Sequence, residues 1–487
     1  MTNYGPRTSD PLSCATAMDK SNDGDLLFNP LEWEYFAEGG KHAAFTGPRD
    51  NKNDGRVLRI RKDDIQGKAD GSHAAECFYT TTVISPLFGS YFDEPTKVDL
   101  DQDIVDTLRR RALENGRIPE SRLQSWEKAD RPAVSDPFAT LHWNYRRLLP
   151  FDCGPCWSIE LKPKAGYTAF SPLVDPDHNA KFRFTRFHIL QQLAAKGVLK
   201  KGWATSSTRP SSYDPLDLFS GEAERQRRAL EVLLDNPQNN IKMWWNEIPI
   251  VGLRQPSLSP EKKQTCTQVL RLVQLVLSEE NILSRLRRLQ LLDVLDADGA
   301  VLVYSRLVDL CGTQELAETL LDSVTECIQP PDDNKQSYLV SSPFRRPECE
   351  GLDNLIRMVD DFADYLPHPS GKHETFHAQA VCCIEGLSKD ACVYLLQNWL
   401  LSLVANDVSV FITLCPQEGS QLELSPLLHA WSIDRKQAAS SPGRIVEASG
   451  LEFLYLVKLV DCEAKPSRKL RERRKTEALT KFFEETA

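Results

Sequence analysis

Residues 156–170, CWSIELKPKAGYTAF, combine an apolar strand pattern with three charged side chains. Glu160, Lys162 and Lys164 alternate after an apolar run, and the period of two predicts that all three lie on one face of an extended segment. Pro163 has no backbone N–H, so we expect this strand at a rim or end of its sheet, where a ligand can reach it. The pattern alone fits a solvated strand face with an ordinary Glu/Lys pair equally well.

The composition indicates a globular protein with a substantial core. The 487 residues are enough for two or three ordinary domains or one large two-lobed domain. Hydrophobic residues make up 41% and charged residues 26%, which is typical of soluble globular chains. The net charge of −10 argues against a general nucleic-acid binder, which needs a positive field over one face. Any anion site must therefore be a local basic patch.

Three features predict a chain that is neither secreted nor embedded in a membrane. The first twenty residues lack the basic start and apolar core of a signal peptide. The most apolar window, residues 391–414, is interrupted by Gln, Asn and Asp, so we expect no membrane span. The thirteen cysteines show no framework spacing, which favours reduced thiols. We expect a monomer in the cytoplasm, the nucleus or both, without a membrane or a specific nucleic acid as partner.

Two segments near the N-terminus suggest a nucleotide loop. An aromatic strand at 33–37 and an apolar segment at 42–45 flank Gly39 and Gly40. Adjacent glycines let the backbone turn sharply and point N–H groups at phosphate oxygens, although a plain hairpin turn has the same pattern. In the strand 56–62, Arg59 faces away from the core-facing apolar residues, where a phosphate ligand or only solvent can meet it. Residues 83–89 read as a strand that ends at a Pro/Gly turn.

Residues 213–221, YDPLDLFSG, read as a turn, a short docking segment and an N-cap at Ser220 that opens a helix over 222–234. After this helix, Asn239, Asn240 and Lys242 offer polar groups that either meet ligand phosphates or only cap the helix. Further helices are predicted from Pro260 and over 281–295 and 301–310, with a turn at 296–299.

Two aspartates are predicted to meet. A helix over 395–405 leads to Asp407 and the strand 408–414, and the strand 453–460 ends at Asp461. If these strands pair antiparallel, the start of the first lies beside the end of the second. One carboxylate could then accept a hydroxyl proton while the other holds Mg²⁺ on nucleotide phosphates, as kinases require. Alternatively, each aspartate only caps a strand end.

Residues 465–475, KPSRKLRERRK, contain seven basic residues in eleven. Such a run can hold a polyanion, or it can be a solvated basic helix or a nuclear-localisation patch, above all over 471–475.

Residues 373–377, HETFH, match the zinc-protease pattern, in which two His bind zinc and the Glu acts as base. No third His or Glu follows at a suitable position between 386 and 417, and prolines just upstream suggest a helix start. A protease with His373, Glu374 and His377 is therefore the less favoured alternative. A structural site that combines His373 and His377 with Cys382 and Cys383 stays open, as does an ordinary structural role.

ELKPK followed by Gly and an aromatic, together with YDPLDLFSG, resembles the signatures of the inositol-pentakisphosphate 2-kinases. Five or six local matches occur in the expected order between Trp33 and Lys469. The resemblance implies transfer of the ATP γ-phosphate to the 2-hydroxyl of inositol 1,3,4,5,6-pentakisphosphate, with ATP and Mg²⁺ as cofactors and inositol hexakisphosphate (phytate) as product. A non-catalytic inositol-phosphate-binding scaffold is the alternative, but it would be expected to lack Asp407 or Asp461.

The resemblance also implies an α+β fold with two lobes, distantly related to protein kinases, with an antiparallel sheet in the N-lobe and a larger mixed C-lobe. The expected organisation is a loose lead-in over 1–30, the N-lobe over 31–145 and the C-lobe over 146–487.

The resemblance assigns each candidate residue a role. Asp407 and Lys162 are the expected catalytic residues, and Asp461 is the expected metal ligand. The expected nucleotide contacts are Glu38, Gly39, Gly40, Lys41, His42, Ala43, Arg59, Glu160 and Lys242. The expected substrate contacts are Lys164, Arg186, Asn239, Asn240, Lys465 and Lys469. The chain departs from the family pattern where Ala37 replaces a Gly, Leu190 a His, and Lys242 and Lys469 an Arg.

Overall fold

A computed structural model provides the structure of the chain. It describes residues 29–38, 42–47, 55–62, 77–116, 118, 138–146, 156–198, 210–252, 257–323, 339, 342–366, 373–416, 444–448, 451–467, 469–470 and 483. The chain divides into two compact units. The first comprises Met1–Asp54, Leu58–Gly67 and Asp99–Ala139, and the second comprises Gly55–Val57, Lys68–Val98 and Thr140–Ala487. The fold is mixed α+β with antiparallel strand pairs, as the sequence predicted. The expected lobe boundaries at residues 30 and 145 stay predictions.

A five-stranded sheet has the order β1-β2-β3-β5-β4. Its strands are β1 (Glu34–Glu38), β2 (His42–Thr46), β3 (Arg56–Arg61), β4 (Thr96–Asp99) and β5 (Phe138–Trp143). Strands β1 and β2 form the predicted hairpin, because Glu38 lies opposite Ala43 in antiparallel register. In the first unit, α4 (Gln102–Glu114) contacts β1 and η1 (Pro30–Glu32).

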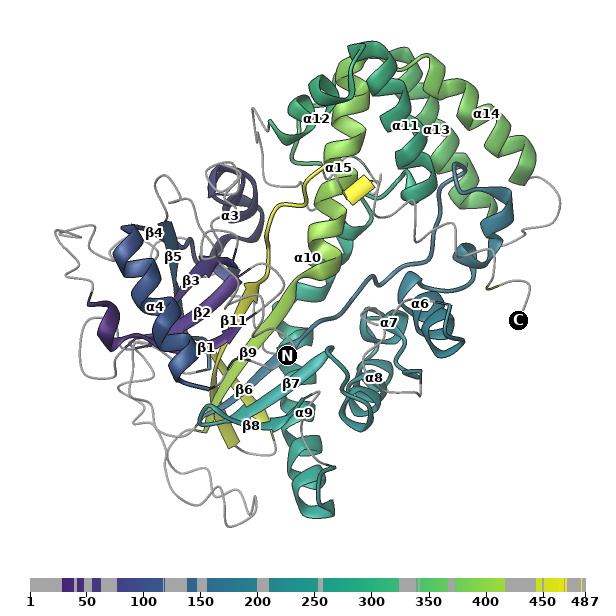
Figure 1. The fold of residues 1–487 in the computed structure, drawn as a ribbon. Helices are drawn as coiled ribbons and strands as arrows, with labels where there is room; N and C mark the ends of the chain where they lie inside the picture. Colours follow the sequence, from purple (N-terminus) through teal and green to yellow (C-terminus); the bar gives the residue numbers. More distant parts are fainter. Residues whose placement is uncertain are drawn as a thin grey trace, which may run out of the picture. The chain divides into compact units, whose positions relative to one another are not determined.

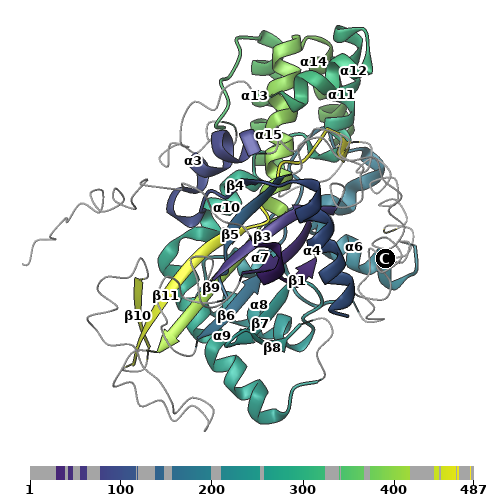
Figure 2. The ribbon, with the colours of Figure 1, turned by 60° about the vertical axis from the view of Figure 1, so that its left-hand side comes forward.

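The second unit contains a six-stranded sheet of order β10-β11-β9-β6-β7-β8. The strands are β6 (Trp157–Leu161), β7 (Ile241–Trp245), β8 (Ile248–Val251), β9 (Ser409–Pro416), β10 (Arg444–Ala448) and β11 (Leu451–Val460). Figures 1 and 2 show β9 between β11 and β6, and both pairs are antiparallel. The strand that carries the signature therefore lies inside the sheet and not at its rim, and Pro163 lies just beyond the strand end at Leu161.

Helices make up most of the rest of this unit. Their bounds are η2 (Thr80–Ile84), α3 (Ser85–Phe88), η3 (Gly89–Tyr91), η4 (Pro176–Phe182), α6 (Arg186–Ala195), α7 (Pro215–Leu218), α8 (Ala223–Asp235), α9 (Pro260–Glu280), α10 (Ile282–Gln290), α11 (Asp296–Cys311), α12 (Gln314–Asp322), α13 (Glu350–Tyr365), α14 (His373–Glu385) and α15 (Lys389–Asp407). Helix α15 is buried along most of its length and contacts α10, α11 and α12. This packing fixes the C-terminal end of α15, where Asp407 is the last helical residue.

Three local predictions are wrong. Residues 83–89 belong to η2, α3 and η3 and not to a strand, because Val83, Ile84 and Phe88 pack into the core as helical residues. Residues 296–299 form the first turn of α11 and not a separate turn. Ser220 is not the N-cap of α8, because Glu222 has that position. The Ser220 hydroxyl instead accepts a hydrogen bond from the Glu222 N–H, just before the helix begins.

None of the helices in the described ranges is both long and apolar enough to cross a membrane. The cysteines that the structure describes form no disulfide.

Two of these thiols should differ strongly in reactivity. Burial raises the pKa of Cys392 to about 12. Burial also raises the pKa of Cys349, but backbone N–H groups of Ser388, Leu352 and Gly351 outweigh it and lower the pKa below its ordinary value. Since the thiolate is the reactive form, a short iodoacetamide pulse at pH 7 should label Cys349 well before Cys392. Peptide mass spectrometry measures both, and equal labelling in the folded protein would contradict the prediction.

Candidate functional site

The site begins at the end of β6. Glu160 on β6 lies opposite Lys242 on β7 and Phe411 on β9. The ammonium of Lys242 contacts the Glu160 carboxylate at 2.9 Å. Strand β6 ends at Leu161, and the next backbone N–H, that of Lys162, donates to the Asn240 carbonyl at 2.8 Å. The backbone oxygen of Asn240 thus holds Lys162 directly after the strand ends.

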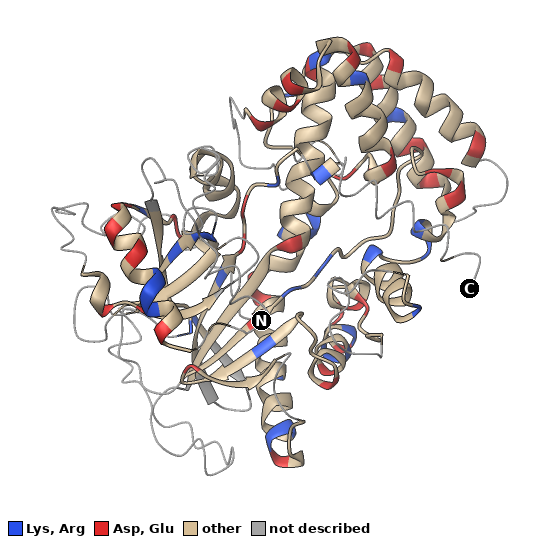
Figure 3. Cartoon of the chain, in the orientation of Figure 1, with Lys and Arg blue, Asp and Glu red and all other residues tan. Residues whose placement is uncertain are grey.

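The chain turns away from strand geometry directly after Lys162. Lys164 has φ 63°, in the left-handed region, so the predicted alternation of Glu160, Lys162 and Lys164 on one face is wrong beyond the strand end. The Tyr213 hydroxyl, from the YDPLDLFSG motif, donates to the Pro163 carbonyl at 2.7 Å. Figure 3 shows Lys and Arg positions, in blue, along the coil that leaves β6. The two signature motifs therefore contact each other, and the second fixes the path of the first.

The predicted antiparallel pairing of the two aspartate-bearing strands is confirmed. Ser409, at the start of β9, lies opposite Val460, at the end of β11. Asp461 follows Val460 directly, and its carboxylate forms an ion pair with Lys162 at 2.7 Å. The Ser409 hydroxyl lies 3.2 Å from an Asp461 oxygen and 3.3 Å from a Glu160 oxygen. One hydroxyl hydrogen therefore links two acidic side chains from different strands.

A second ion pair lies beside the first. Lys465 contacts the carboxylate of Asp407 at 2.8 Å. In each pair the lysine is mostly buried, with 16–17% of the side chain exposed, whereas Asp407 is 50% and Asp461 40% exposed. The carboxylates are thus open to a ligand while their lysine partners are held in place.

The negative charges of both aspartates affect the pKa of Lys162. Burial lowers its pKa, but the negative charges of Asp461, Glu160 and Asp407 raise it, and the net pKa lies above the ordinary value of 10.5. Lys162 is therefore charged at neutral pH. The mutual influence also shows that the two ion pairs form one charged cluster.

The cluster has the composition of a phosphoryl-transfer site. Asp461 and Glu160 supply carboxylate oxygens, which are the ligands that Mg²⁺ prefers. Lys162 and Lys465 supply cations for phosphate oxygens. Asp407 adds an accessible carboxylate that can accept a proton.

Comparison with known proteins assigns the family. A model of the family described as "Inositol-pentakisphosphate 2-kinase" matches residues 35–478. This chain belongs to the inositol-pentakisphosphate 2-kinase family.

Three curated relatives carry the name inositol-pentakisphosphate 2-kinase. The protein from Arabidopsis thaliana is 30% identical over 254 residues, which cover 47% of this chain and 53% of the relative. The Danio rerio protein is 30% identical over 47% of this chain and 44% of the relative. The Oryza sativa subsp. indica protein is 23% identical over 57% of this chain and 69% of the relative. The chain thus spans about half the length of the Arabidopsis and Danio relatives it matches.

The nucleotide-loop candidates of the family pattern lie only partly within the described residues. Gly39, Gly40 and Lys41 lie outside them, as does the side chain of Glu38. His42 and Ala43 are buried in β2. The Arg59 guanidinium lies 3.4 Å from His42 Nδ1, so the structure brings these two candidates together.

The remaining substrate candidates occupy different surroundings. Asn239 is exposed and Asn240 buried, directly before β7. Arg186, at the start of α6, lines a cavity of about 50 Å³ together with Leu190, Lys181 and Asn406. Asn406 immediately precedes Asp407 in α15, but Asp407 itself does not line this cavity. The Lys469 N–H donates to the Pro466 carbonyl and so closes a turn over residues 466–469.

Sequence reasoning missed two site residues. Ser409 lies two positions after Asp407, and its place at the strand start is the signal that could have found it. Gln290, at the end of α10, contacts the segment after β6 through its side-chain amide. A buried glutamine in an amphipathic helix gives no sequence signal of that kind.

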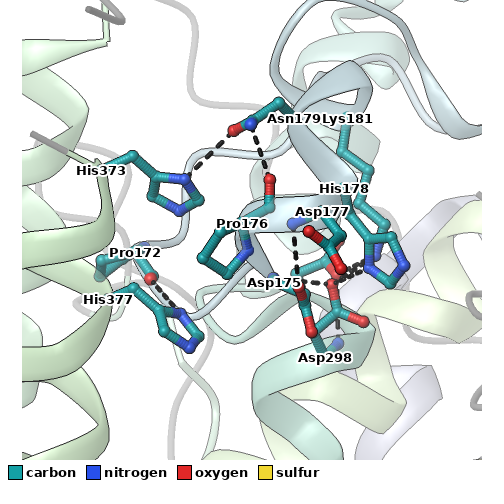
Figure 4. A network of polar contacts seen from close by, with 11 residues as sticks. Pro172, Asp175, Pro176, Asp177, His178, Asn179, Lys181, Asp298, His373 and His377 are labelled. Carbon is teal, nitrogen blue, oxygen red and sulfur yellow. Dashed lines mark hydrogen bonds and ion pairs between the residues drawn. The ribbon is translucent and has the colours of Figure 1, made fainter. Parts of the chain in front are cut away.

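The HETFH motif has a structural role in this member of the family (Figure 4). The His377 Nδ1 donates to the Pro172 carbonyl at 3.1 Å, and the His373 Nδ1 lies 3.1 Å from the Asn179 side-chain oxygen. Burial and His377 lower the pKa of His373, so its ring is neutral at neutral pH. Among the described residues, no three His, Cys, Asp or Glu side chains are placed to hold a metal. The motif therefore docks α14 onto residues 172–179.

The same segment is also tied to the start of α11 (Figure 4). Lys181 forms ion pairs with Asp296 at 2.7 Å and Asp298 at 2.9 Å, and His178 Nδ1 lies 2.9 Å from Asp298. These contacts fix the chain that leads into α6 and hence Arg186.

Proposed function

We propose that this chain transfers the γ-phosphate of ATP to the 2-hydroxyl of inositol 1,3,4,5,6-pentakisphosphate, with Mg²⁺ as cofactor. The observation that carries the proposal is the cluster of two accessible aspartates, each paired with a buried lysine, at the joined ends of β9 and β11. Membership of the family supports the reaction class. We further propose that the α+β fold is the two-lobed arrangement distantly related to protein kinases.

The lysines and the substrate are matched in charge. Five phosphates carry about −7 to −10 in total, since each contributes about −1.5 to −2. Substrate phosphates can compete with Asp461 for Lys162 and with Asp407 for Lys465, because a phosphate offers several charged acceptor oxygens. Substrate binding would then release each carboxylate for its own task. Asp407 would accept the proton of the attacking hydroxyl, and Lys162 and Lys465 would hold the phosphates that flank it.

Mg²⁺, when bound, neutralises charge on the transferring phosphoryl group. Asp461 and Glu160 would hold it, and the Ser409 hydroxyl orients both carboxylates. Arg59 and Lys242 would contact nucleotide phosphates, and Lys164, Arg186, Asn239, Asn240 and Lys469 would contact the inositol phosphate. Catalysis is then mainly positioning and charge stabilisation.

The direct test is a transfer assay with radiolabelled ATP and a panel of inositol phosphates. We expect Mg²⁺-dependent label in inositol hexakisphosphate when the 1,3,4,5,6-pentakisphosphate is the acceptor. The scaffold alternative predicts binding of the same compound without transfer. Transfer only to acceptors whose 2-hydroxyl is already phosphorylated would contradict the proposed position.

Replacing Lys162 by alanine should weaken substrate use in a salt-dependent way. The KM for inositol pentakisphosphate should rise about tenfold to hundredfold at low salt, because a charged hydrogen bond contributes about 1.5–3 kcal/mol. The rise should shrink as salt screens the remaining charges. Steady-state kinetics at several salt concentrations measure this effect.

Lys263 provides the matched control, because it forms an exposed ion pair with Asp235. Lys263→Ala should leave both KM values unchanged. If Lys162→Ala changed only the KM for ATP, the division of the cations between the two ligands would be wrong.

A further inference from the structure

Gln290 is a fully buried glutamine whose side chain makes three hydrogen bonds. Its Oε1 accepts from the Gly166 N–H at 2.9 Å, and its Nε2 donates to the Lys164 carbonyl at 2.8 Å and to the Ala405 carbonyl at 3.3 Å. The amide group of glutamine has two N–H hydrogens and one oxygen, so each has a partner here. No ion pair or charged group takes part in these contacts.

Two of these bonds fix the coil after β6. Lys164 has φ 63°, a conformation that non-glycine residues adopt only where the surroundings hold them. Gln290 binds the backbone on either side of Ala165, at Lys164 and at Gly166, and so holds this conformation.

The other side of the same coil is closed by the YDPLDLFSG motif. A Cβ atom at Gly166 would lie 2.2 Å from the Phe219 ring. The coil therefore runs between the Gln290 amide and the Phe219 ring with no room for a side chain at position 166. Its path is set from both sides.

The third hydrogen bond of Gln290 is made to α15, the helix that ends at Asp407. Ala405 lies two residues before Asp407, at the C-terminal end of α15. Helix ends leave carbonyl groups without intrahelical partners, so a donor at this point restrains the end of the helix. A single side chain thus connects the coil that carries Lys162 and Lys164 with the helix that carries Asp407.

We infer that Gln290 is a positioning residue for phosphoryl transfer, which fixes the Lys162–Lys164 coil relative to the helix end that presents Asp407. The inference rests on the proposed function for its kinetic consequence. Gln290 itself does not touch the substrate. A displacement of about 1 Å between reacting groups is enough to reduce turnover strongly. Loss of the three Gln290 hydrogen bonds, which together we call the Gln290 clamp, should therefore slow phosphoryl transfer.

The first test replaces Gln290 by methionine, which keeps the volume and removes all three hydrogen bonds. We expect kcat/KM for inositol pentakisphosphate to fall at least about tenfold, with the KM for ATP within about twofold of the wild type. Gln274→Met is the matched control. Gln274 is also buried, and its amide donates to the Ser278 hydroxyl within α9. The inference is wrong if both variants lose the same activity at the same loss of thermal stability.

The second test measures the effect of the Gln290 clamp on the backbone and needs no activity assay. Amide hydrogen exchange over residues 162–169 should accelerate in Gln290→Met and stay unchanged in Gln274→Met. Unchanged exchange in Gln290→Met overturns the inference even if the proposed reaction is not observed. Conversely, faster exchange with no transfer by the wild-type protein would support the clamp and contradict the proposed function.

The third test uses Gln290→Glu, which serves if the methionine variant does not fold. A protonated carboxyl group can donate one hydrogen bond, whereas an ionised one repels both carbonyl oxygens. We expect the activity of this variant, relative to the wild type, to rise as the pH falls. A constant ratio across the pH range would contradict the inference.

Discussion

Asp407→Asn is expected to lower kcat for phosphoryl transfer by about 10²- to 10⁴-fold, the range over which a general base contributes. The amide keeps the shape of the side chain but cannot accept the hydroxyl proton. Inositol phosphate binding should survive and become tighter, because Lys465 loses its carboxylate partner and one negative charge leaves the cluster. Single-turnover kinetics and calorimetric titration with inositol hexakisphosphate measure the two effects separately.

Asp390→Asn provides the control on the same helix. Asp390 lies in the first turn of α15, at the opposite end from Asp407, and is exposed. This variant should retain wild-type kcat. Undiminished turnover by Asp407→Asn would remove Asp407 as the base, and a fall in both kcat and binding would indicate a structural role.

The meeting of the two aspartates could be predicted from sequence, because strand geometry alone implies it. Two apolar strands that pair antiparallel bring the chain just before the first close to the chain just after the second, although β10 lies between them in the sequence. Asp407 and Asp461 have these positions, and the register of Ser409 opposite Val460 confirms the pairing. Their roles in chemistry stay predictions that the experiments above test.

The partners of the lysines could not be predicted in the same way. The alternation predicts Lys162 beside Lys164 on one strand face, but the strand ends at Leu161, and contacts with Gln290 and Tyr213 hold the left-handed turn at Lys164. Gln290 lies 124 residues after Gly166 in the sequence. Such distant side-chain contacts leave no periodic pattern for sequence analysis to detect.

The strand propensity of single residues also gave a wrong prediction where burial decides the conformation. Residues 80–84, TTTVI, are β-branched and favour a strand, yet they form η2, because Val83 and Ile84 pack into the core of the second unit. The HETFH motif shows how a spacing can mislead, although the sequence already made a protease the less favoured alternative. Its spacing fits zinc, but both Nδ1 atoms face oxygen atoms of residues 172–179, which shows that the histidines dock two segments.

Asp461→Asn is the second large expected effect. Loss of this charge should lower kcat/KM at ordinary Mg²⁺ by about 10²- to 10³-fold, because metal-ion stabilisation of the transferring group contributes several kcal/mol and each 1.36 kcal/mol is a factor of ten. Asparagine tolerates the left-handed backbone of position 461, where φ is 61°, and can still accept from Ser409, so the fold should persist. Initial rates over a range of Mg²⁺ concentrations should show half-saturation at higher Mg²⁺, which Asp407→Asn should leave unchanged.

The contrast between the two aspartate variants assigns their roles. Asp309→Asn, an exposed carboxylate on α11, is the control for loss of negative charge alone and should match the wild type in both respects. If Asp407→Asn shifted the Mg²⁺ dependence and Asp461→Asn did not, the metal ligand and the base would have to be exchanged. If neither variant shifted it, the metal would be held by other oxygen donors, of which Glu160 is the next to replace, because the Ser409 hydroxyl links it to the same cluster.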